Sequence, residues 1–259
     1  MPKLSICYIV RNEIECLPAS VLKMRKLADE IVIVDTGSHD GTDAWAQVVA
    51  DTYGSIGWND DFSEARNYAI ELATGDWILM IDADEWIDER YFPEIYKLIY
   101  NEGGIDGYML QVYNFLQDPF WIKKPYIFYG KALRLFKKKE NVFYDGIIHE
   151  RLMNVENVEE VGVPVYHFQF HEAKKINKKF KKYVSMMERK IKAEGRTFIN
   201  LVHLSDAYRR KYIWTQDEKA LKKMLAILDE ALKINNDPTI LQVYNEYKKR
   251  MEVSHAGQS

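Results

Sequence analysis

The feature that most constrains the fold is a set of short, continuously apolar segments near the start of the chain, separated by segments with helical periodicity. The apolar segments indicate strands at residues 4–10, 30–34 and 77–81, with a shorter extended piece at 52–56. Helices are predicted between them at residues 14–28, 40–50 and 62–73. Strands that are apolar along almost their whole length are typical of parallel sheets covered on both faces. The pattern therefore predicts an α/β fold with a mostly parallel central sheet flanked by helices.

The character of the sequence changes twice after this region. From residue 103 to about 170, strand-like segments alternate with Pro, Gly and Asn, which predicts a mixed extension of the same sheet. After residue 172 the periodicity is helical, and the segment before and after the Asn-Asn-Asp-Pro turn has the spacing of a helix-turn-helix repeat. We therefore predict an α/β domain over residues 1–172, a C-terminal helical subdomain over 173–253, and a disordered tail over 254–259.

Charge and hydropathy bear on the binding partners and the location of the protein. The chain has 36 basic and 39 acidic residues and a net charge of -3, so no global positive field indicates a nucleic-acid partner. The apolar run Leu4–Val10 is too short to span a membrane and lacks the pattern of a signal peptide. A cytoplasmic location is expected.

Polar residues follow three of the predicted strands. Arg11 follows the first strand, Asp35 the second, and Asp82 the last, with Asp84 two residues further on. In open α/β sheets, ligands bind beyond the carboxyl ends of the strands. Paired carboxylates suit Mg²⁺ or Mn²⁺, whose remaining ligands are waters and substrate phosphates. The pattern favours a cation and a diphosphate at this edge, although an isolated D-x-D could simply cap a turn.

Other phosphate- and metal-binding motifs are absent from the sequence. It contains no GxxxxGK[ST] loop, and "DTGSHDGT" lacks the GxGxxG spacing of a dinucleotide-binding fold. No HExxH occurs. Walker-type, nicotinamide and metalloprotease chemistry are therefore excluded.

An ordered set of motifs resembles the inverting glycosyltransferases of family 2 with the GT-A fold. The motifs are "SICYIVRNEIECLPASV", "DEIVIVDTGSHDGT" and "WNDDFSEARNYAIELATGDWILMIDADE", followed more loosely by "GIIHE" and "VYHF". The resemblance covers about the first 170 residues. It implies a nucleotide-sugar half over about 1–102 and an acceptor half over about 103–172. The most similar branch includes bacterial transferases that act on peptides or proteins and others that build cell-surface glycans.

The resemblance also implies a donor site. Its residues would be Val10, Arg11, Glu13, Asp35, Arg66, Asp82 and Ala83. A carboxylate only accepts hydrogen bonds, so Asp35 suits the imide N–H of uracil, and the guanidinium of Arg66 suits a diphosphate or a uracil carbonyl. The alternatives are a turn role for Asp35 and a solvent-facing helical position for Arg66.

The implied cofactor is Mn²⁺ or Mg²⁺, with Asp84 as the dominant ligand and Asp82 and His167 as further ligands. His167 could instead be an ordinary packed residue. Inverting transfer also requires a general base near the acceptor. "YDGIIHE" offers Asp145, His149 and Glu150, of which Glu150 is the predicted base and Asp145 the second choice. A structural hydrogen-bonded pair of His149 and Glu150 is the alternative.

Together these observations predict a metal-dependent inverting glycosyltransferase that moves a hexose or N-acetylhexosamine from a UDP-sugar to a peptide, protein or glycan acceptor. One alternative is a sugar-1-phosphate nucleotidyltransferase, although the glycine-rich basic loop of that class is missing. Another is a non-catalytic helical-repeat interaction protein with a degenerate nucleotide pocket. The lysine-rich stretch 174–182 predicts a solvated helix face, or contact with an anionic acceptor or a membrane surface. The helical tail could also form a homodimer.

Overall fold

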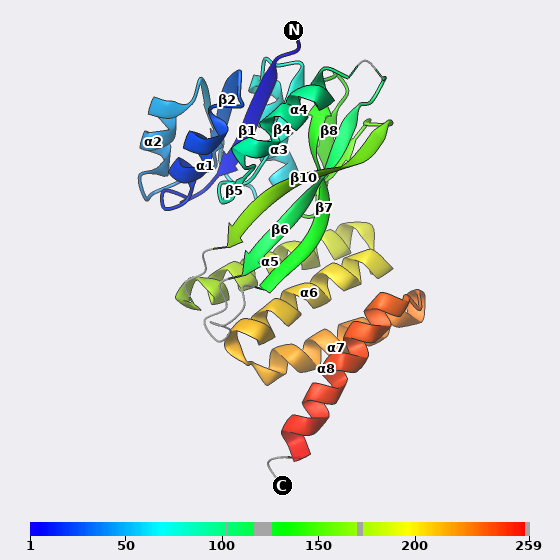
Figure 1. Cartoon of the computed structure of the whole chain (residues 1–259). Coiled ribbons are helices and arrows are strands. Elements are labelled where there is room, and N and C mark those ends of the chain that lie inside the picture. Colours follow the sequence, from blue (N-terminus) through cyan, green and yellow to red (C-terminus); the bar gives the residue numbers. More distant parts are fainter. Residues whose placement is uncertain (102, 117–125, 170–172, 257–259) are drawn as a thin grey trace. The chain divides into compact units, whose positions relative to one another are not determined.

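The computed structural model describes the chain except residues 102, 117–125, 170–172 and 257–259. It divides into two compact units, Met1–Phe170 and His171–Ser259 (Figure 1). The first unit combines helices with an eight-stranded sheet, and the described part of the second is helical. The predicted α/β class with a C-terminal helical region is confirmed.

The first unit alternates strands and helices up to α4 and is mostly strands afterwards. Its strands are β1 (Leu4–Val10), β2 (Glu30–Asp35), β3 (Thr52–Ser55), β4 (Trp77–Met80), β5 (Glu85–Trp86), β6 (Gly107–Leu116), β7 (Tyr126–Lys137), β8 (Phe143–Asp145), β9 (Arg151–Met153) and β10 (Val158–Gln169). Its helices are α1 (Leu17–Met24), α2 (Thr42–Val49), α3 (Phe62–Leu72), the 3₁₀ helix η1 (Glu89–Tyr91) and α4 (Phe92–Ile99).

The main sheet has the strand order β3-β2-β1-β4-β7-β6-β10-β5. The first four strands are parallel, and β7 joins them antiparallel to β4, so the sheet is mixed as predicted. In the register, Val10 pairs with Asp35 and Cys7 pairs with Met80. The carboxyl ends of β1, β2 and β4 therefore lie at one edge of the sheet, which carries the predicted site residues.

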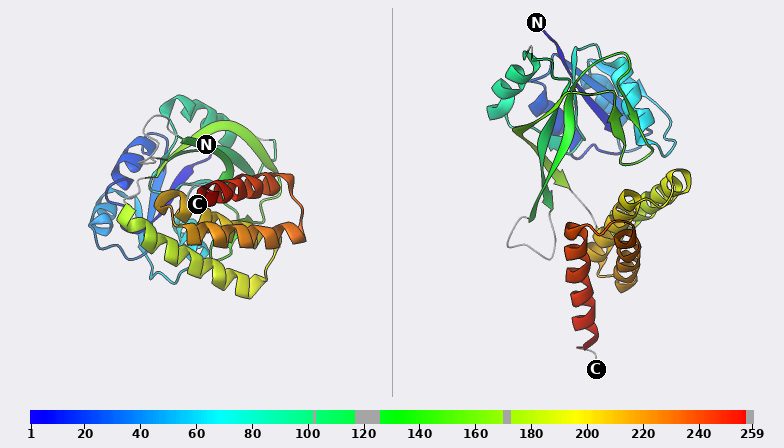
Figure 2. Two further views of the ribbon diagram at one scale, coloured as in Figure 1. Left: turned by 90° about the horizontal axis from the view of Figure 1, so that it is seen from below. Right: turned by 90° about the vertical axis from the view of Figure 1, so that its right-hand side faces the viewer.

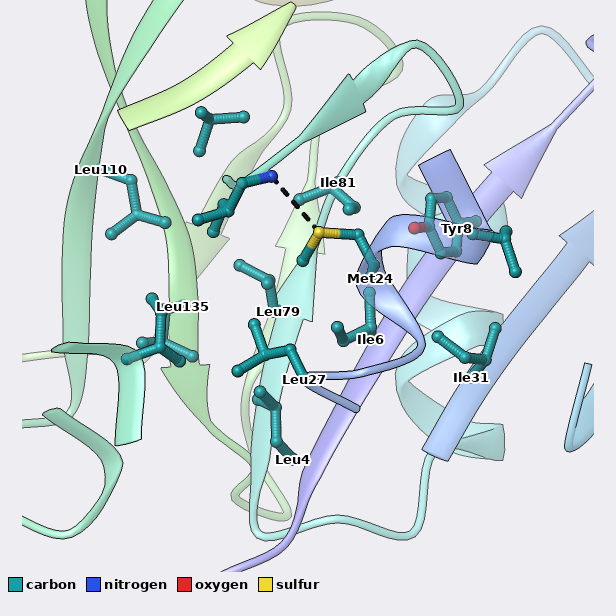
Figure 3. Close-up of a cluster of buried hydrophobic side chains, with 14 of the residues drawn as sticks. Leu4, Ile6, Tyr8, Met24, Leu27, Ile31, Leu79, Ile81, Leu110 and Leu135 are labelled. Carbon is teal, nitrogen blue, oxygen red and sulfur yellow. Dashed lines mark hydrogen bonds between the residues drawn. The ribbon is translucent and has the colours of Figure 1, made fainter. Parts of the chain in front are cut away.

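Two hydrophobic layers cover the faces of the sheet. On one face, buried side chains of α1, α2 and α4 form one cluster with the even-numbered side chains of β1, and Figure 3 shows Met24 of α1 lying between Ile6, Leu27 and Leu79. On the other face, α3 packs against Cys7 and Ile78. Because both faces are covered, the central strands can be apolar throughout, which is the signal that the sequence carries.

Several elements differ from the prediction. Helix α1 begins at Leu17 instead of residue 14, because Pro18 lacks a backbone N–H and fits only the first turn of a helix. Helix α4 was not predicted. Strands β8 and β9 pair only with each other, forming a two-stranded sheet outside the main one.

The described part of the second unit consists of four consecutive helices (Figure 2), namely α5 (Ala173–Glu194), α6 (Phe198–Thr215), α7 (Glu218–Ile234) and α8 (Pro238–Ala256). The buried face of α7 has helical spacing and comprises Ala220, Leu221, Met224, Leu225, Leu228 and Ala231. Helix α8 continues to Ala256, past the expected start of the tail at 254. The side chains of 173–179, including most of the lysine-rich stretch, lie outside the described part. Among the described helices, none is long and apolar enough to cross a membrane.

A close contact before β4 gives a stability prediction. A Cβ on Gly75 would lie 2.6 Å from Ser5 Oγ and 2.7 Å from Ser5 N, which is backbone and cannot move aside. We expect Gly75→Ala to lower the free energy of unfolding by about 2–3 kcal/mol in urea denaturation. For the control, Gly57→Ala, no described atom lies within 4 Å of the added Cβ. A change within about 1 kcal/mol is expected there, and equal effects at both sites would contradict the prediction.

Candidate active site

The turn after β4 carries Asp82, Ala83 and Asp84 and is fixed at both ends. The backbone N–H of Asp82 donates to Glu85 Oε2 at 3.0 Å, and the N–H of Glu85 donates to the Asp82 carbonyl at 3.0 Å. Beyond the turn, β5 pairs with the end of β10, placing Glu85 opposite His167. The N–H of Phe168 donates to the Asp84 carbonyl at 3.0 Å. The turn is therefore held by its own glutamate and by the last strand of the sheet.

Two arginines hold the carboxylate of Asp82. Arg66 Nη2, from α3, donates to Asp82 Oδ1 at 3.0 Å, and Arg134 Nη2, from β7, donates to Asp82 Oδ2 at 3.2 Å. Burial opposes ionisation of Asp82, but Arg134 and Arg66 outweigh it and lower its pKa well below the usual value. Asp82 is therefore a carboxylate whose charge is already neutralised by protein groups.

Arg66 also reaches the predicted base. Its Nε donates to Glu150 Oε1 at 2.5 Å, and the side chains of Arg66 and Glu150 are only 8% and 12% exposed. Burial disfavours the guanidinium charge, but Asp82 and Glu150 outweigh that effect and raise the pKa of Arg66. The alternative of a solvent-facing Arg66 is thus excluded, and Arg66 links Glu150 to Asp82 of the D-x-D turn.

Asp84 faces a different partner. His167 Nε2 lies 3.2 Å from Asp84 Oδ1, and His167 Nδ1 lies 3.9 Å from Glu85 Oε1. In the described ranges, no group of three or more His, Cys, Asp or Glu side chains is arranged to hold a metal ion. The structure brings two of the three predicted metal ligands, Asp84 and His167, together, while Asp82 is turned to the arginines.

The Asp84–His167 contact predicts a pH dependence. Burial lowers the pKa of His167, but the hydrogen bond and charge of Asp84 outweigh it, and the net shift is upward. Below the unfolded-state value near 6.5 the pair is fully formed, and its stabilisation is lost as pH rises through the raised pKa.

In EDTA, the free energy of unfolding of the parent should therefore fall above about pH 6.5 relative to His167→Gln. The slope of the difference is at most about 1.4 kcal/mol per pH unit, because one proton is involved. Urea denaturation between pH 6 and 9 measures it, and parallel curves for the two proteins would refute the prediction.

The loops after β1 and β2 are tied together at the same edge. The N–H of Asn12 donates to Ser38 Oγ at 2.8 Å, and the N–H of Glu13 donates to Thr42 Oγ1 at 2.8 Å. Arg11, the residue that follows β1, is exposed. Val10 and Ala83 are buried, at 2% and 5% exposure, so their side chains pack in the core and only their backbones are suited to a ligand.

Asp35 has the turn role that its sequence context allowed, and its second carboxylate oxygen takes no part in the turn. Its Oδ1 accepts from the N–H groups of Gly37 and Ser38 at 2.7 and 2.9 Å, which is the turn role. Its Oδ2 is buried and has no hydrogen-bond partner within the described part of the chain. Because a buried acceptor without a partner is costly, Asp35 Oδ2 is suited to a ligand donor.

The remaining base candidates lie on or next to the β8–β9 hairpin. Asp145 ends β8 and is exposed, and His149 is exposed in a left-handed conformation with φ of 50°. Asn67 fixes this hairpin to α3, because its side chain exchanges two hydrogen bonds with the backbone of Tyr144 at 2.6 and 2.9 Å. Glu150, which follows His149, contacts the arginine–aspartate cluster through Arg66.

Sequence reasoning missed Glu85 and Arg134. Glu85 is fully buried and pairs with Arg134 at 2.6 Å. A charged residue inside the apolar strand "KALRLF" was the available signal for Arg134, and the Glu that directly follows "DAD" was the signal for Glu85. Glu85 is the last residue of the motif that ends in "IDADE", whereas Arg134 lies outside the motifs that carry the family resemblance.

Comparison with known proteins identifies the family of the chain. The model of the family described as glycosyl transferase family 2 matches residues 5–162. A TPR repeat-containing protein of Synechococcus elongatus is 33% identical over 150 residues, which cover 58% of this chain and 35% of that protein. The glycosyltransferase SunS, derived from the SPbeta prophage of Bacillus subtilis, is 24% identical over 91% of this chain and 55% of its own length.

Among solved structures, S. aureus TarS 1-349 in complex with UDP aligns with 98% of this chain and 92% of that chain, at 12% identity and a TM-score of 0.48. Because the family model covers more than half of the sequence, the chain belongs to glycosyl transferase family 2. It spans about a third and about a half of the lengths of the two relatives named above.

Proposed function

We propose that the protein is a metal-dependent inverting glycosyltransferase that uses a UDP-sugar donor. The observation that carries the proposal is the cluster at the carboxyl ends of the strands, where Asp84 and His167 form one pair and Asp82, Arg66 and Glu150 form a connected chain. Family membership supports the reaction class. The acceptor would be a peptide or protein side chain or a glycan.

The nucleoside end of the donor would bind at the loops after β1 and β2. Asp35 Oδ2, buried and without a partner in the described chain, would accept from the imide N–H of uracil. Arg11 and Glu13 lie in the adjoining loop, which is bonded to the loop after Asp35. A uracil base would therefore satisfy this buried acceptor.

The donor set fits a divalent cation bound by few protein ligands. The side chains of Asp84 and His167 are 25% and 16% exposed, so both are partly accessible, and the carboxylate is the ligand type that suits Mn²⁺ or Mg²⁺. Water and the donor diphosphate would complete the ligand shell. When bound, the cation would neutralise the charge that develops on the departing diphosphate.

The protein groups would carry out the remainder of a single displacement. Glu150 would take the proton from the acceptor heteroatom as that atom bonds to the anomeric carbon. The bond from the anomeric carbon to the diphosphate breaks, and UDP leaves with the bonding electron pair. Arg66, between Glu150 and Asp82, would hold the base in position. Attack on the face opposite the leaving group inverts the anomeric configuration.

The assignment of the base gives a paired prediction. We expect Glu150→Gln to lower kcat for transfer by at least about a hundredfold, because removal of a general base costs roughly 10²–10⁴ in rate. Asp145→Asn, an exposed neighbour, should lower it by less than about threefold. Steady-state transfer kinetics measure both, and the reverse order would assign the base to Asp145.

The donor class is tested by UDP release from UDP-glucose, UDP-galactose and UDP-N-acetylglucosamine, with Mn²⁺ or with EDTA. The proposal expects Mn²⁺-dependent release from at least one donor, slow without acceptor. Formation of UTP from UDP-sugar and pyrophosphate would instead indicate a nucleotidyltransferase. Failure to bind or cleave any of the three would favour a non-catalytic protein.

A further inference from the structure

Glu85 and Arg134 form a buried ion pair beside the D-x-D turn. Glu85 is 0% and Arg134 13% exposed by side chain, and Arg134 Nη2 lies 2.6 Å from Glu85 Oε1. A charged carboxylate at this depth requires a partner, since an unpaired buried charge is strongly destabilising. The reaction proposed above assigns no role to this pair.

One nitrogen of Arg134 contacts both Glu85 and Asp82. Nη2 donates to Glu85 Oε1 and also to Asp82 Oδ2 at 3.2 Å. The other carboxylate oxygen of Glu85 accepts from the backbone N–H of Asp82 at 3.0 Å. Glu85 therefore fixes the arginine and the backbone of Asp82 together, and the arginine fixes the Asp82 side chain.

Asp82 is consequently held on two sides. Arg66 Nη2 binds Asp82 Oδ1 from α3, and Arg134 Nη2 binds Asp82 Oδ2 from β7. Each oxygen of this carboxylate has a charge-assisted hydrogen bond, the strong kind. Asp84 has no such arginine contact among the described residues; its carboxylate meets His167.

We infer that Arg134 is a positioning residue that divides the roles of the two aspartates. By holding Asp82 against Arg66, Arg134 keeps Asp82 out of the cation site and leaves Asp84, with His167, to bind the cation. The inference rests on the proposed function, because it assumes a cation at Asp84. It adds that Asp82 becomes an available ligand when Arg134 is removed.

The test is the loss of Mn²⁺ affinity caused by Asp84→Asn, measured in several backgrounds through the EPR signal of free Mn²⁺. In the parent, Asp84→Asn should weaken Mn²⁺ binding at least tenfold. In Arg134→Met, the same change should weaken binding less than threefold, because Asp82 Oδ2, no longer bound by Arg134, substitutes for the carboxylate of Asp84 while Oδ1 stays on Arg66. In Arg134→Lys, the loss should return to the parental size, because a single ammonium nitrogen can replace Nη2.

Lys131→Met is the matched control. Lys131 lies on the same strand and pairs with Glu160 at the surface, so its removal subtracts the same charge without touching Asp82. In the Lys131→Met background, Asp84→Asn should weaken Mn²⁺ binding at least tenfold, as in the parent. If Arg134→Met fails to fold, Arg134→Met with Glu85→Gln removes the stranded buried charge and still releases Asp82.

The outcomes distinguish a failure of the role of Arg134 from a failure of the cation site at Asp84. An equal loss in the parent and in Arg134→Met would overturn the role of Arg134 while the cation site at Asp84 stands. Equal Mn²⁺ affinity of the parent and of the single variant Asp84→Asn would overturn the cation site, and the division of roles with it.

Discussion

Asp84→Asn should abolish the Mn²⁺-dependent turnover of the UDP-sugar donor. The amide keeps the size of the side chain but removes the anionic oxygen that the cation needs, so kcat should fall at least about a hundredfold, or about 2.7 kcal/mol. Asp84 is 25% exposed and meets a single histidine, so the free energy of unfolding should change by less than about 1 kcal/mol. Steady-state UDP release and urea denaturation measure the two quantities.

Asp88→Asn provides the matched control. Asp88 lies four residues further along, is 37% exposed by side chain, and caps η1 while pairing with Arg90. The same chemical change there should leave turnover within about twofold, because surface pairs contribute little. Parental turnover in Asp84→Asn would contradict the metal role of Asp84, whatever the control shows.

Arg66→Met should cause the largest loss of stability of any single substitution in the cluster. The guanidinium is 8% exposed and separates two carboxylates, Asp82 and Glu150. Its removal leaves uncompensated buried charge, which costs about 3–5 kcal/mol. Urea denaturation should therefore show a correspondingly lower free energy of unfolding.

Two variants check that the loss arises from buried charge. Adding Glu150→Gln to Arg66→Met should recover part of the stability, because it removes the buried charge of Glu150, whereas Asp82 still pairs with Arg134. Arg90→Met removes an arginine that is 75% exposed and should cost less than about 1 kcal/mol. If Arg66→Met costs no more than Arg90→Met, the cluster is not the buried ion network described here.

The parts of the fold that the sequence predicts are those whose signal is local. Strands β1, β2 and β4 are covered on both faces, so they are almost entirely apolar and stand out at once. Strand β5 could not be predicted, because it has two residues and exists only through pairing with β10 about 80 positions later. Helix α4 did carry a signal, since Phe92, Ile95 and Ile99 have helical spacing and Pro93 suits the first turn of a helix.

The candidate site also has parts that the sequence predicts and parts that it does not. The position of Asp82 and Asp84 follows from their place after an apolar strand, because parallel strands bring their carboxyl ends to one edge. Which positively charged side chain contacts each aspartate cannot be predicted from the local sequence. Arg134 reaches Asp82 from a strand 52 positions later, through the antiparallel pairing of β4 with β7. The roles of the two aspartates therefore depend on long-range pairing.

The most direct test of the central claim is isothermal titration of UDP into the protein with Mn²⁺ and with EDTA. A diphosphate that binds mainly through a cation at Asp84 should bind at least about tenfold more tightly with Mn²⁺, a difference of about 1.4 kcal/mol. Equal affinity under both conditions would contradict a metal-dependent UDP-sugar site at the D-x-D turn.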